Sequence, residues 1–359
     1  MSINIPFSCI KPLLHALPAE TAHGLTIKSM KAGLSPKYQQ VTNDSLRVKL
    51  WGLDFANPVG LSAGFDKNAE VIAPTLNMGF GFTEVGTVTP NPQSGNPRPR
   101  VFRDVKNQAV INRMGFPNGG LDIFKKNVKA FRRHKNAPQG ILGLNIGMNK
   151  TQTEPAEDYS ALIESLGDLA DYYTINISSP NTPGLRNLQS REHLLPLINA
   201  VKTARKNNCD RENPPPILVK LAPDLDEAQQ EELAQAVMDA GVNGLILTNT
   251  TLARPEDLPE DFRAQQGGLS GAPVRDKSTE IIGSFYKLTK GQIPIIGAGG
   301  VSSGADAYAK IKAGASLVQL YSALVFHGPA LVNQINHDLI AHLKADGFDN
   351  IADAVGLGH

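Results

Sequence analysis

Short apolar runs recur along the chain, and each is followed by glycine or polar residues and then by a helical pattern. Continuous apolar runs of this length are typical of strands that are covered on both faces of a parallel sheet. We predict eight such strands, namely Val59–Leu61, Phe82–Val85, Leu142–Ile146, Tyr173–Ile177, Ile217–Leu221, Gly244–Thr248, Ile293–Gly297 and Leu317–Leu320.

Helical patterns separate these strands. One is Asp226–Ala240, with Asp224 or Asp226 as its cap and Gly241 as its stop, and another is Ser303–Ala313. Strand and helix alternating eight times favour an α/β fold of the closed (β/α)8 TIM barrel type. The alternative is an open doubly wound sheet, which normally carries a GxGxxG turn after an early strand. No such turn follows the early strands here.

Three connections are longer than the others. Segment 86–141 contains Val101–Asp104 and Ala109–Asn112, which we predict to pair as a hairpin; the other two long connections are 178–190 and 249–275. Long loops in a compact domain are usually functional, and in a barrel the loops after the strands build the active face.

Residues 1–40 precede the first strand, and their apolar positions predict two helices separated by Pro18. These positions are Phe7, Ile10, Leu13, Leu14 and Leu17, then His23, Ile27, Met30 and Leu34, with Gly33 near the second helix end. Lysines dominate the charges of this segment, and basic amphipathic helices can lie in a membrane interface. The alternative is a helical pair packed over the bottom of the barrel.

Composition narrows the function further. The chain has 359 residues and a formal net charge of +1, so no strong global field attracts nucleic acid. Cys9 and Cys209 make no disulfide framework, and no His or Cys spacing indicates a metal site. Because no run approaches the roughly 20 apolar residues of a membrane-spanning helix, any membrane contact would be peripheral.

Polar residues follow most of the predicted strands. Because barrel strands direct their carboxyl ends toward one face, these residues converge there. They are Ala63–Lys67, Gly86-Thr87, Asn145, Asn176–Asn181, Lys220, Thr248–Thr250, Gly297–Gly300 and Tyr321-Ser322.

The turn Gly297–Gly300 follows the seventh strand and precedes a helix. Backbone N–H groups in such a turn attract an anion, and barrel phosphate sites lie after strands seven and eight. A phosphate site with neutral amide and hydroxyl groups around it suits a mononucleotide cofactor.

Four asparagines, Asn112, Asn176, Asn181 and Asn249, are expected to face one cavity. Asparagine offers donors and an acceptor, so several together suit a flat neutral ring with alternating C=O and N–H groups. A lone asparagine more often serves a turn. Lys67 and Lys220 suit a carboxylate or an anionic ring, although solvated surface lysines are the alternative.

These motifs resemble those of dihydroorotate dehydrogenases over nearly the whole chain. The matching runs are Ser62–Lys67, Ile111–Phe116, Asn176–Gly184, Thr248–Thr251, Gly267–Gly271, Lys277–Glu280 and Pro294–Gly300. Soluble members of that family carry cysteine at the position of Ser179, so the serine resembles the quinone-reducing, membrane-associated group. Met148 departs from the pattern, because relatives usually carry a basic residue there.

The resemblance implies roles for individual residues in oxidising dihydroorotate to orotate. Ser179 would be the base, with Thr182 and a water as its proton relay. Substrate would be held by Lys67, Asn112, Arg113, Met114, Gly115, Phe116, Asn176, Asn181, Asn249 and Thr250. FMN would be held by Ala63, Gly64, Phe65, Asp66, Lys67, Thr87, Asn145, Asn176, Lys220, Thr248, Gly271, Gly300, Tyr321 and Ser322.

The quinone-reducing group also implies a domain organisation. Residues 1–40 would form a membrane-facing extension that admits ubiquinone or menaquinone through a tunnel lined by His23, Arg100 and Arg103, and residues 41–359 would form the FMN barrel. The absence of a spanning segment before the helices in this sequence leads us to expect a bacterial protein or a shortened form of a longer chain. A bacterial protein of this kind would lie on the cytoplasmic face of the inner membrane.

Three alternatives remain open at this point. The first is a soluble dihydroorotate dehydrogenase linked to fumarate or NAD, which cysteine at position 179 would mark. The second is another FMN barrel such as a tRNA-dihydrouridine synthase, which would want a basic face for phosphates. The third is a non-catalytic interaction protein that does not bind FMN.

Overall fold

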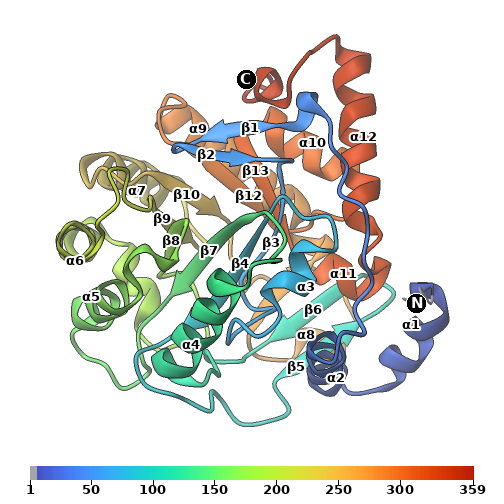
Figure 1. The fold of residues 1–359 in the computed structure, drawn as a ribbon, viewed down its shortest axis with the longest axis horizontal. Coiled ribbons are helices and arrows are strands. Elements are labelled where there is room, and N and C mark those ends of the chain that lie inside the picture. The colour runs from blue at the N-terminus through green and yellow to red at the C-terminus, as the bar shows by residue number, and fades with distance from the viewer. Residues whose placement is uncertain (1–5) are drawn as a thin grey trace.

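Eight parallel strands pair edge to edge and close into a barrel in the computed structural model, which describes residues 6–359 (Figure 1). Each predicted strand is present, and β13 pairs with β3 to close the ring, so the (β/α)8 prediction is confirmed. The strands are β3 (Val59–Leu61), β4 (Phe82–Val88), β7 (Ile141–Ile146), β8 (Tyr172–Asn176), β9 (Ile217–Leu221), β10 (Gly244–Leu247), β12 (Ile295–Ala298) and β13 (Ala315–Leu320).

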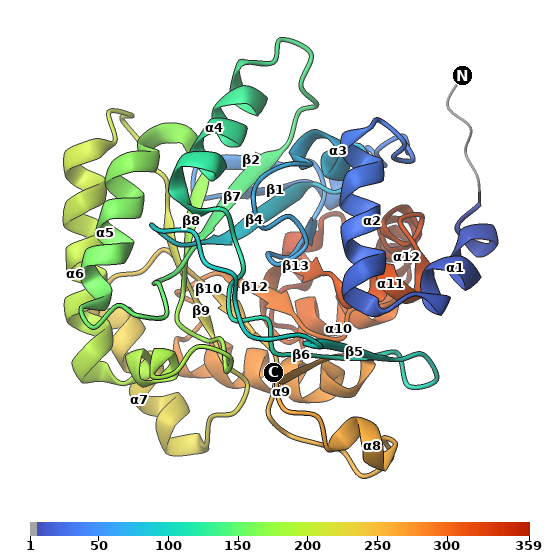
Figure 2. The same ribbon diagram turned by 90° about the horizontal axis from the view of Figure 1, so that it is seen from below.

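Helices lie on the outside of this barrel (Figures 1 and 2). Asp226, and not Asp224, caps α7, because its side chain accepts from Gln229 N–H in a capping box. Ser303 caps α10 by accepting a hydrogen bond from Asp306 N–H. The helices that follow strands are α3 (Ile72–Leu76), α4 (Gly120–Arg133), α5 (Pro155–Leu166), α6 (Arg191–Asn208), α7 (Glu227–Asp239), α8 (Glu260–Arg263), α9 (Arg275–Leu288), α10 (Gly304–Lys312), α11 (Ser322–His327) and α12 (Leu331–Asp346).

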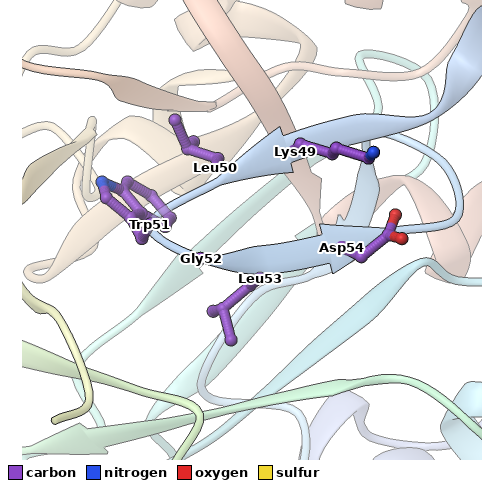
Figure 3. Close-up of a pocket in the computed structure, with 6 residues that line it drawn as sticks. All are labelled: Lys49, Leu50, Trp51, Gly52, Leu53 and Asp54. Atoms are coloured by element: carbon purple, nitrogen blue, oxygen red, sulfur yellow. The ribbon is translucent and has the colours of Figure 1, made fainter. Parts of the chain in front are cut away.

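A small hairpin, β1 (Val48–Leu50) and β2 (Leu53–Phe55), seals the amino-terminal end of the barrel. Trp51 lies at the tip of this hairpin (Figure 3). Its Nε1 donates to the carbonyl of Asn243 at 2.7 Å, and the centroid of its ring lies 6.4 Å from that of Tyr172. A hollow of about 350 Å³ is lined by Lys49–Asp54. It lies at the end of the barrel opposite to the polar strand ends, so it is not part of the candidate site.

Aromatic side chains fill the barrel interior above this hairpin. A Cβ on Gly60 would collide with the ring of Phe82, and one on Gly143 would collide with the ring of Tyr172. The glycines therefore leave space that the two large rings occupy, as expected of a close-packed interior. Both rings are fully buried.

The predicted hairpin in the long insertion is present as β5 (Val101–Asp104) and β6 (Ala109–Asn112). Strand β6 also pairs with β11 (Gly268–Gly271) from the connection after β10. The two longest loops thus form one three-stranded sheet (Figure 2). Ile111 and Leu269 are fully buried in a small core of this sheet.

The amino-terminal segment forms α1 (Phe7–Ala16) and α2 (Ala19–Lys31), with the predicted break between them. Gly33 closes the turn that follows α2, because its φ of 80° permits its N–H to bond Met30 O while Leu34 N–H bonds Ser29 O. Leu34 therefore lies beyond the helix with 75% of its surface exposed, and its predicted place on a face of the second helix is wrong. Residues 1–5, where the expected extension begins, lie outside the described residues.

The helical pair lies beside α11 and the β5–β6 hairpin (Figures 1 and 2). His15 Nε2 lies 2.9 Å from Val325 O, and Arg103 donates to His15 O at 2.6 Å. The alternative of packing over the barrel bottom is wrong, because β1 and β2 occupy that end. Of the helices within residues 6–359, none has the length and apolar character needed to cross a membrane.

Candidate active site

Three polar side chains from neighbouring strands meet at the carboxyl end of the barrel. Thr87 donates from Oγ1 to Asn145 Oδ1 at 2.5 Å, and Asn176 donates from Nδ2 to Thr87 Oγ1 at 2.9 Å and to Asn145 Oδ1 at 3.1 Å. The sequence-predicted residues of β4, β7 and β8 are therefore held in one hydrogen-bonded cluster. Their amide orientations follow from these bonds.

Glu84 lies beneath this cluster, and we did not predict it from the sequence. Its side chain is fully buried and accepts hydrogen bonds from Asn145 Nδ2 at 2.7 Å and from Tyr172, Thr174 and Gln319, each at 3.0 Å. Four donors offset much of the cost of burying a carboxylate. The signal was available, because Glu84 is a charge inside the apolar run of β4.

Lys220 lies in β9, one residue before its end, and is also buried. Burial lowers the pKa of its ammonium, and the charge of Glu84 opposes that shift. The predicted lysine is therefore a barrel-interior residue and not a solvated one. Its amine is placed where it can act on an electron-rich ring.

The loop after β8 joins the loops after β6 and β10. Asn249 donates from Nδ2 to Ser178 Oγ at 2.8 Å, and Ser178 Oγ donates to Asn176 Oδ1 at 3.0 Å. Asn181 donates from Nδ2 to Asn112 O at 3.1 Å. The four predicted asparagines therefore fall into two hydrogen-bonded groups, which the loop Asn176–Asn181 brings together. Ser178 is a link that we did not predict.

Ser179 lies within this region and is buried. Its Oγ accepts a hydrogen bond from Asn181 N–H at 3.2 Å, which favours negative charge on the oxygen. Thr182 is buried as well. Within residues 6–359, no direct hydrogen bond joins the Thr182 hydroxyl to Ser179, so the relay through Thr182 and water stays a prediction.

Lys67 reaches the site from the loop after β3. Its Nζ donates to Gly64 O at 2.7 Å and lies 3.4 Å from His23 Nε2. Burial lowers the pKa of Lys67 to about 8, against the opposing charges of Glu20 and Asp66. The ammonium is therefore mostly charged at neutral pH and available to a carboxylate.

His23 connects this lysine to the last strand end. Burial, and then the charge of Lys67, lower the pKa of His23 to about 3, so its imidazole is neutral at physiological pH. Its Nδ1 lies 3.4 Å from the hydroxyl of Tyr321. The ring of Phe65 packs edge-on against both His23 and Tyr321, with ring centroids 5.6 Å apart in each pair.

The two predicted tunnel arginines fasten α1 and α2 to the insertion. Arg100 is buried and donates to Glu20, with a shortest distance of 2.7 Å, and to the carbonyls of Ser94 and Asn96. Arg103 donates to the carbonyls of His15 and Leu17. Their contacts are thus with the protein itself, while the lining of a tunnel stays a prediction.

The side chains of Asp66 and Met148 make their contacts within the protein. Both carboxylate oxygens of Asp66 accept backbone N–H groups, from Glu70 at 2.8 Å and Val71 at 2.7 Å. Burial nevertheless raises the pKa of Asp66 to about 6. Met148 is buried in the main hydrophobic core, which accounts for an apolar residue at that position.

The glycine turn after β12 packs directly against the start of α9. Gly300 has a φ of 72°, and a Cβ there would lie 2.5 Å from Arg275 Cα. A Cβ on Gly271, whose φ is 99°, would strike Gln108 O. Ser322 Oγ lies 2.8 Å from Ser270 Oγ. Three loops thus bring their backbones together where we predicted the phosphate.

The hydroxyl of Thr248 is buried at the end of β10 and finds no hydrogen-bond partner within the described residues. A buried orphan polar group costs free energy, and a ligand that supplies the partner removes that cost. The glycine-rich turns, the amide cluster, the buried Lys220 and this hydroxyl fit a mononucleotide with a polar ring. Between residues 6 and 359, no group of three His, Cys, Asp or Glu side chains could hold a metal ion.

Comparison with known proteins agrees with this geometry. The chain is 52% identical to a dihydroorotate dehydrogenase (quinone) from Azorhizobium caulinodans, over 98% of both chains. It is 47% identical to the mitochondrial dihydroorotate dehydrogenase (quinone) of Mus musculus, over 97% of this chain and 88% of the mouse protein. The solved structure of DHODH from Eimeria tenella in complex with ferulenol superposes with a TM-score of 0.93 at 39% identity, over 97% of this chain and 99% of that chain.

A model of the dihydroorotate dehydrogenase family matches residues 45–343, which contain every strand of the barrel and every polar strand end described above. The two helices before that region are also covered by the relatives named as quinone enzymes. The chain therefore belongs to the dihydroorotate dehydrogenase family, in its quinone-dependent group.

Proposed function

We propose that this protein oxidises dihydroorotate to orotate in pyrimidine biosynthesis, with FMN as the bound flavin and a membrane quinone as the final electron acceptor. The observation that carries the proposal is that the loop of Ser179 brings together two hydrogen-bonded pairs of asparagines, Asn176 with Asn249 through Ser178 and Asn112 with Asn181. Relatives of about 50% identity are named for this activity.

The substrate is a flat ring with alternating C=O and N–H groups and one carboxylate. Asn176 and Asn249 offer amides to the ring from one side, and Asn112 and Asn181 from the other loops. Lys67 holds the carboxylate, because its ammonium is buried, largely protonated at neutral pH and, within residues 6–359, not part of a salt bridge. Residues Arg113–Phe116 and Thr250 complete the proposed substrate contacts.

Oxidation removes one proton and one hydride from adjacent carbons of the substrate. Ser179 takes the proton from the carbon next to a carbonyl, where that proton is most acidic. When bound, FMN would supply the acceptor for the hydride of the neighbouring carbon and the two electrons that reduce the quinone. The N–H of Asn181 stabilises charge on the Ser179 oxygen, and Thr182 with a water carries the proton onward to solvent.

The residues proposed for FMN divide between its two ends. Gly271, Gly300 and Ser322 surround the phosphate, since their loops meet at the start of α9. Thr87, Asn145, Lys220 and Thr248 serve the ring, and the orphan hydroxyl of Thr248 gains a partner there. For Asp66 only the backbone is free to contribute, because its carboxylate bonds two N–H groups.

Residues 1–40 are proposed as the quinone- and membrane-facing extension of the barrel formed by residues 41–359. None of the residues of α1 is buried, and Leu13 has 71% of its surface exposed. Lys11 and Lys28 lie in the two helices, so exposed apolar groups and cations occur together, as interfacial helices require. We propose peripheral attachment at the cytoplasmic face of the inner membrane, with His23 on the quinone route.

The first half of this reaction is tested by anaerobic mixing of the purified protein with dihydroorotate. The flavin absorbance near its long-wavelength maximum should bleach, and orotate should form in equal amount to the flavin reduced. Protein that remains colourless after incubation with FMN would support the non-catalytic alternative. Bound flavin that does not bleach would point to another flavin barrel, such as a tRNA-dihydrouridine synthase.

A further inference from the structure

Lys310 is a lysine with no exposed surface, and the proposed reaction does not use it. It lies in α10, the helix that follows the glycine turn Gly299-Gly300. Its Nζ donates three hydrogen bonds, to Thr279 Oγ1 at 2.9 Å, to Ser278 Oγ at 3.0 Å and to Arg275 O at 3.2 Å. All three acceptors are neutral and belong to the first turns of α9.

No ion pair within residues 6–359 involves Lys310. The nearest acid of its own helix, Asp306, pairs with Arg275 at 2.8 Å and accepts from Ser302. A buried ammonium without a carboxylate partner is costly, and burial is the first cause that lowers the pKa of Lys310 to about 7. Two hydroxyls and a carbonyl satisfy its donors, while the charges of Asp306 and Asp276 act on it without a direct ion pair.

The segment that Lys310 holds is the one on which the glycine turn rests. Ser278, which accepts from Lys310, donates to Ala298 O at 2.6 Å, immediately before that turn. A Cβ on Gly299 would lie 3.1 Å from Ser278 Oγ, and one on Gly300 would lie 2.5 Å from Arg275 Cα. The side chain of Ser278 therefore lies between the Lys310 ammonium and the backbone that is proposed to receive the FMN phosphate.

We infer that Lys310 is a positioning residue whose buried charge is matched by the phosphate of FMN, and that it sets the preference for FMN over unphosphorylated riboflavin. The inference rests on the proposed FMN function. A phosphate adds about two negative charges at pH 7, and a charge across a low-dielectric interior acts over more than contact distance. A purely structural tie between α9 and α10 would need the hydrogen bonds of Lys310 but not its charge.

The test compares the affinities of the flavin-free full chain for FMN and for riboflavin. Each affinity is measured from the quenching of flavin fluorescence on binding. Lys310→Gln keeps hydrogen-bond donors but removes the charge. It should weaken FMN binding by about tenfold to a hundredfold and leave riboflavin binding within about twofold. Lys312→Gln is the matched control, since Lys312 lies in the same helix but is exposed and pairs with Asp346. It should change neither affinity.

Wild-type protein gives a second readout that needs no variant. The charged groups acting on Lys310 are Asp306 in α10 and Arg275 and Asp276 in α9, while β12 contributes none. The protonated lysine binds the phosphate better, so FMN affinity relative to riboflavin should fall roughly fivefold from pH 7.5 to 9, where the phosphate charge is constant. Lys310→Gln should lose this decline.

The outcomes separate the two claims. Wild-type protein that binds neither flavin contradicts the proposed function. Wild-type protein that prefers FMN, with a Lys310→Gln variant of unchanged preference, overturns the inference while leaving the function intact. A wild-type preference that is flat between pH 7.5 and 9 overturns it as well, whether or not the variant folds.

Discussion

The two ends of the barrel are built from the same eight strands but differ in the side chains that fill them. At the amino-terminal end, Trp51, Phe55, Phe82 and Tyr172 fill the interior, and glycines such as Gly60 leave them room. At the carboxyl-terminal end, asparagine, threonine and lysine side chains bond one another, and the hydroxyl of Thr248 has no partner within the described chain.

The comparison indicates that residues at one end of the barrel stabilise the fold, while residues at the other end serve ligand binding. The aromatic end gains its stability from burial of large apolar side chains, which requires no ligand. The polar end holds an orphan hydroxyl and buried cations, which a ligand would satisfy. Glu84 lies between the two ends, since its carboxylate bonds Tyr172 below and Asn145 above. Substitutions at the two ends should therefore change different measurements.

The largest effect on activity is expected from Ser179→Ala at the polar end. Flavin reduction by dihydroorotate should slow by roughly 10²–10⁴-fold, because the base is removed while the ring contacts remain. Orotate and FMN binding should stay near the wild-type values in equilibrium titrations. Stopped-flow reduction at close to the wild-type rate would remove Ser179 from its role.

The largest effect on stability is expected from Phe82→Ala at the aromatic end. Loss of a fully buried ring should lower the free energy of unfolding by about 3–5 kcal/mol, measured by denaturant titration. The molecules that remain folded should bind FMN as the wild type does. If FMN affinity fell and stability did not, the division between the two ends would be wrong.

A smaller effect is expected from Thr248→Val, which removes the orphan hydroxyl and keeps the shape. Flavin-free protein should be equally stable or up to about 1 kcal/mol more stable, while FMN binding should weaken by about tenfold. Thr174→Val is the matched control, because its hydroxyl donates to Glu84, and it should cost about 1–3 kcal/mol. Equal stability losses in both variants would contradict the distinction.

The barrel was predictable because each strand is a short apolar run between glycine or polar residues. The hairpin of β5 and β6 was predictable for the same reason. The β1–β2 hairpin was not, since its three-residue strands are too short to give a period, and nothing local indicates that Trp51 contacts Asn243 across the barrel floor. Leu34 followed the helical spacing, but Gly33 ended the helix before it.

The sequence was sufficient to predict which strand ends form the site, but not the hydrogen bonds between their side chains. The four asparagines were found because each follows a strand or lies in an adjoining loop. Ser178 was passed over beside Ser179, because alternation alone does not say which hydroxyl bonds Asn249. Arg100 was predicted to line a tunnel, and this stays a prediction. Its bonds to Glu20 were not predicted, because they depend on the docking of α2, which the local sequence does not encode.

The central claim is that this chain passes electrons from dihydroorotate to a quinone. The most direct measurement starts from protein whose flavin has been bleached anaerobically by dihydroorotate, followed by separate addition of a ubiquinone analogue, fumarate and NAD. We predict that only the quinone restores the flavin absorbance within seconds. Recovery with fumarate or NAD, and none with quinone, would contradict the account and assign the chain to the soluble type of acceptor chemistry.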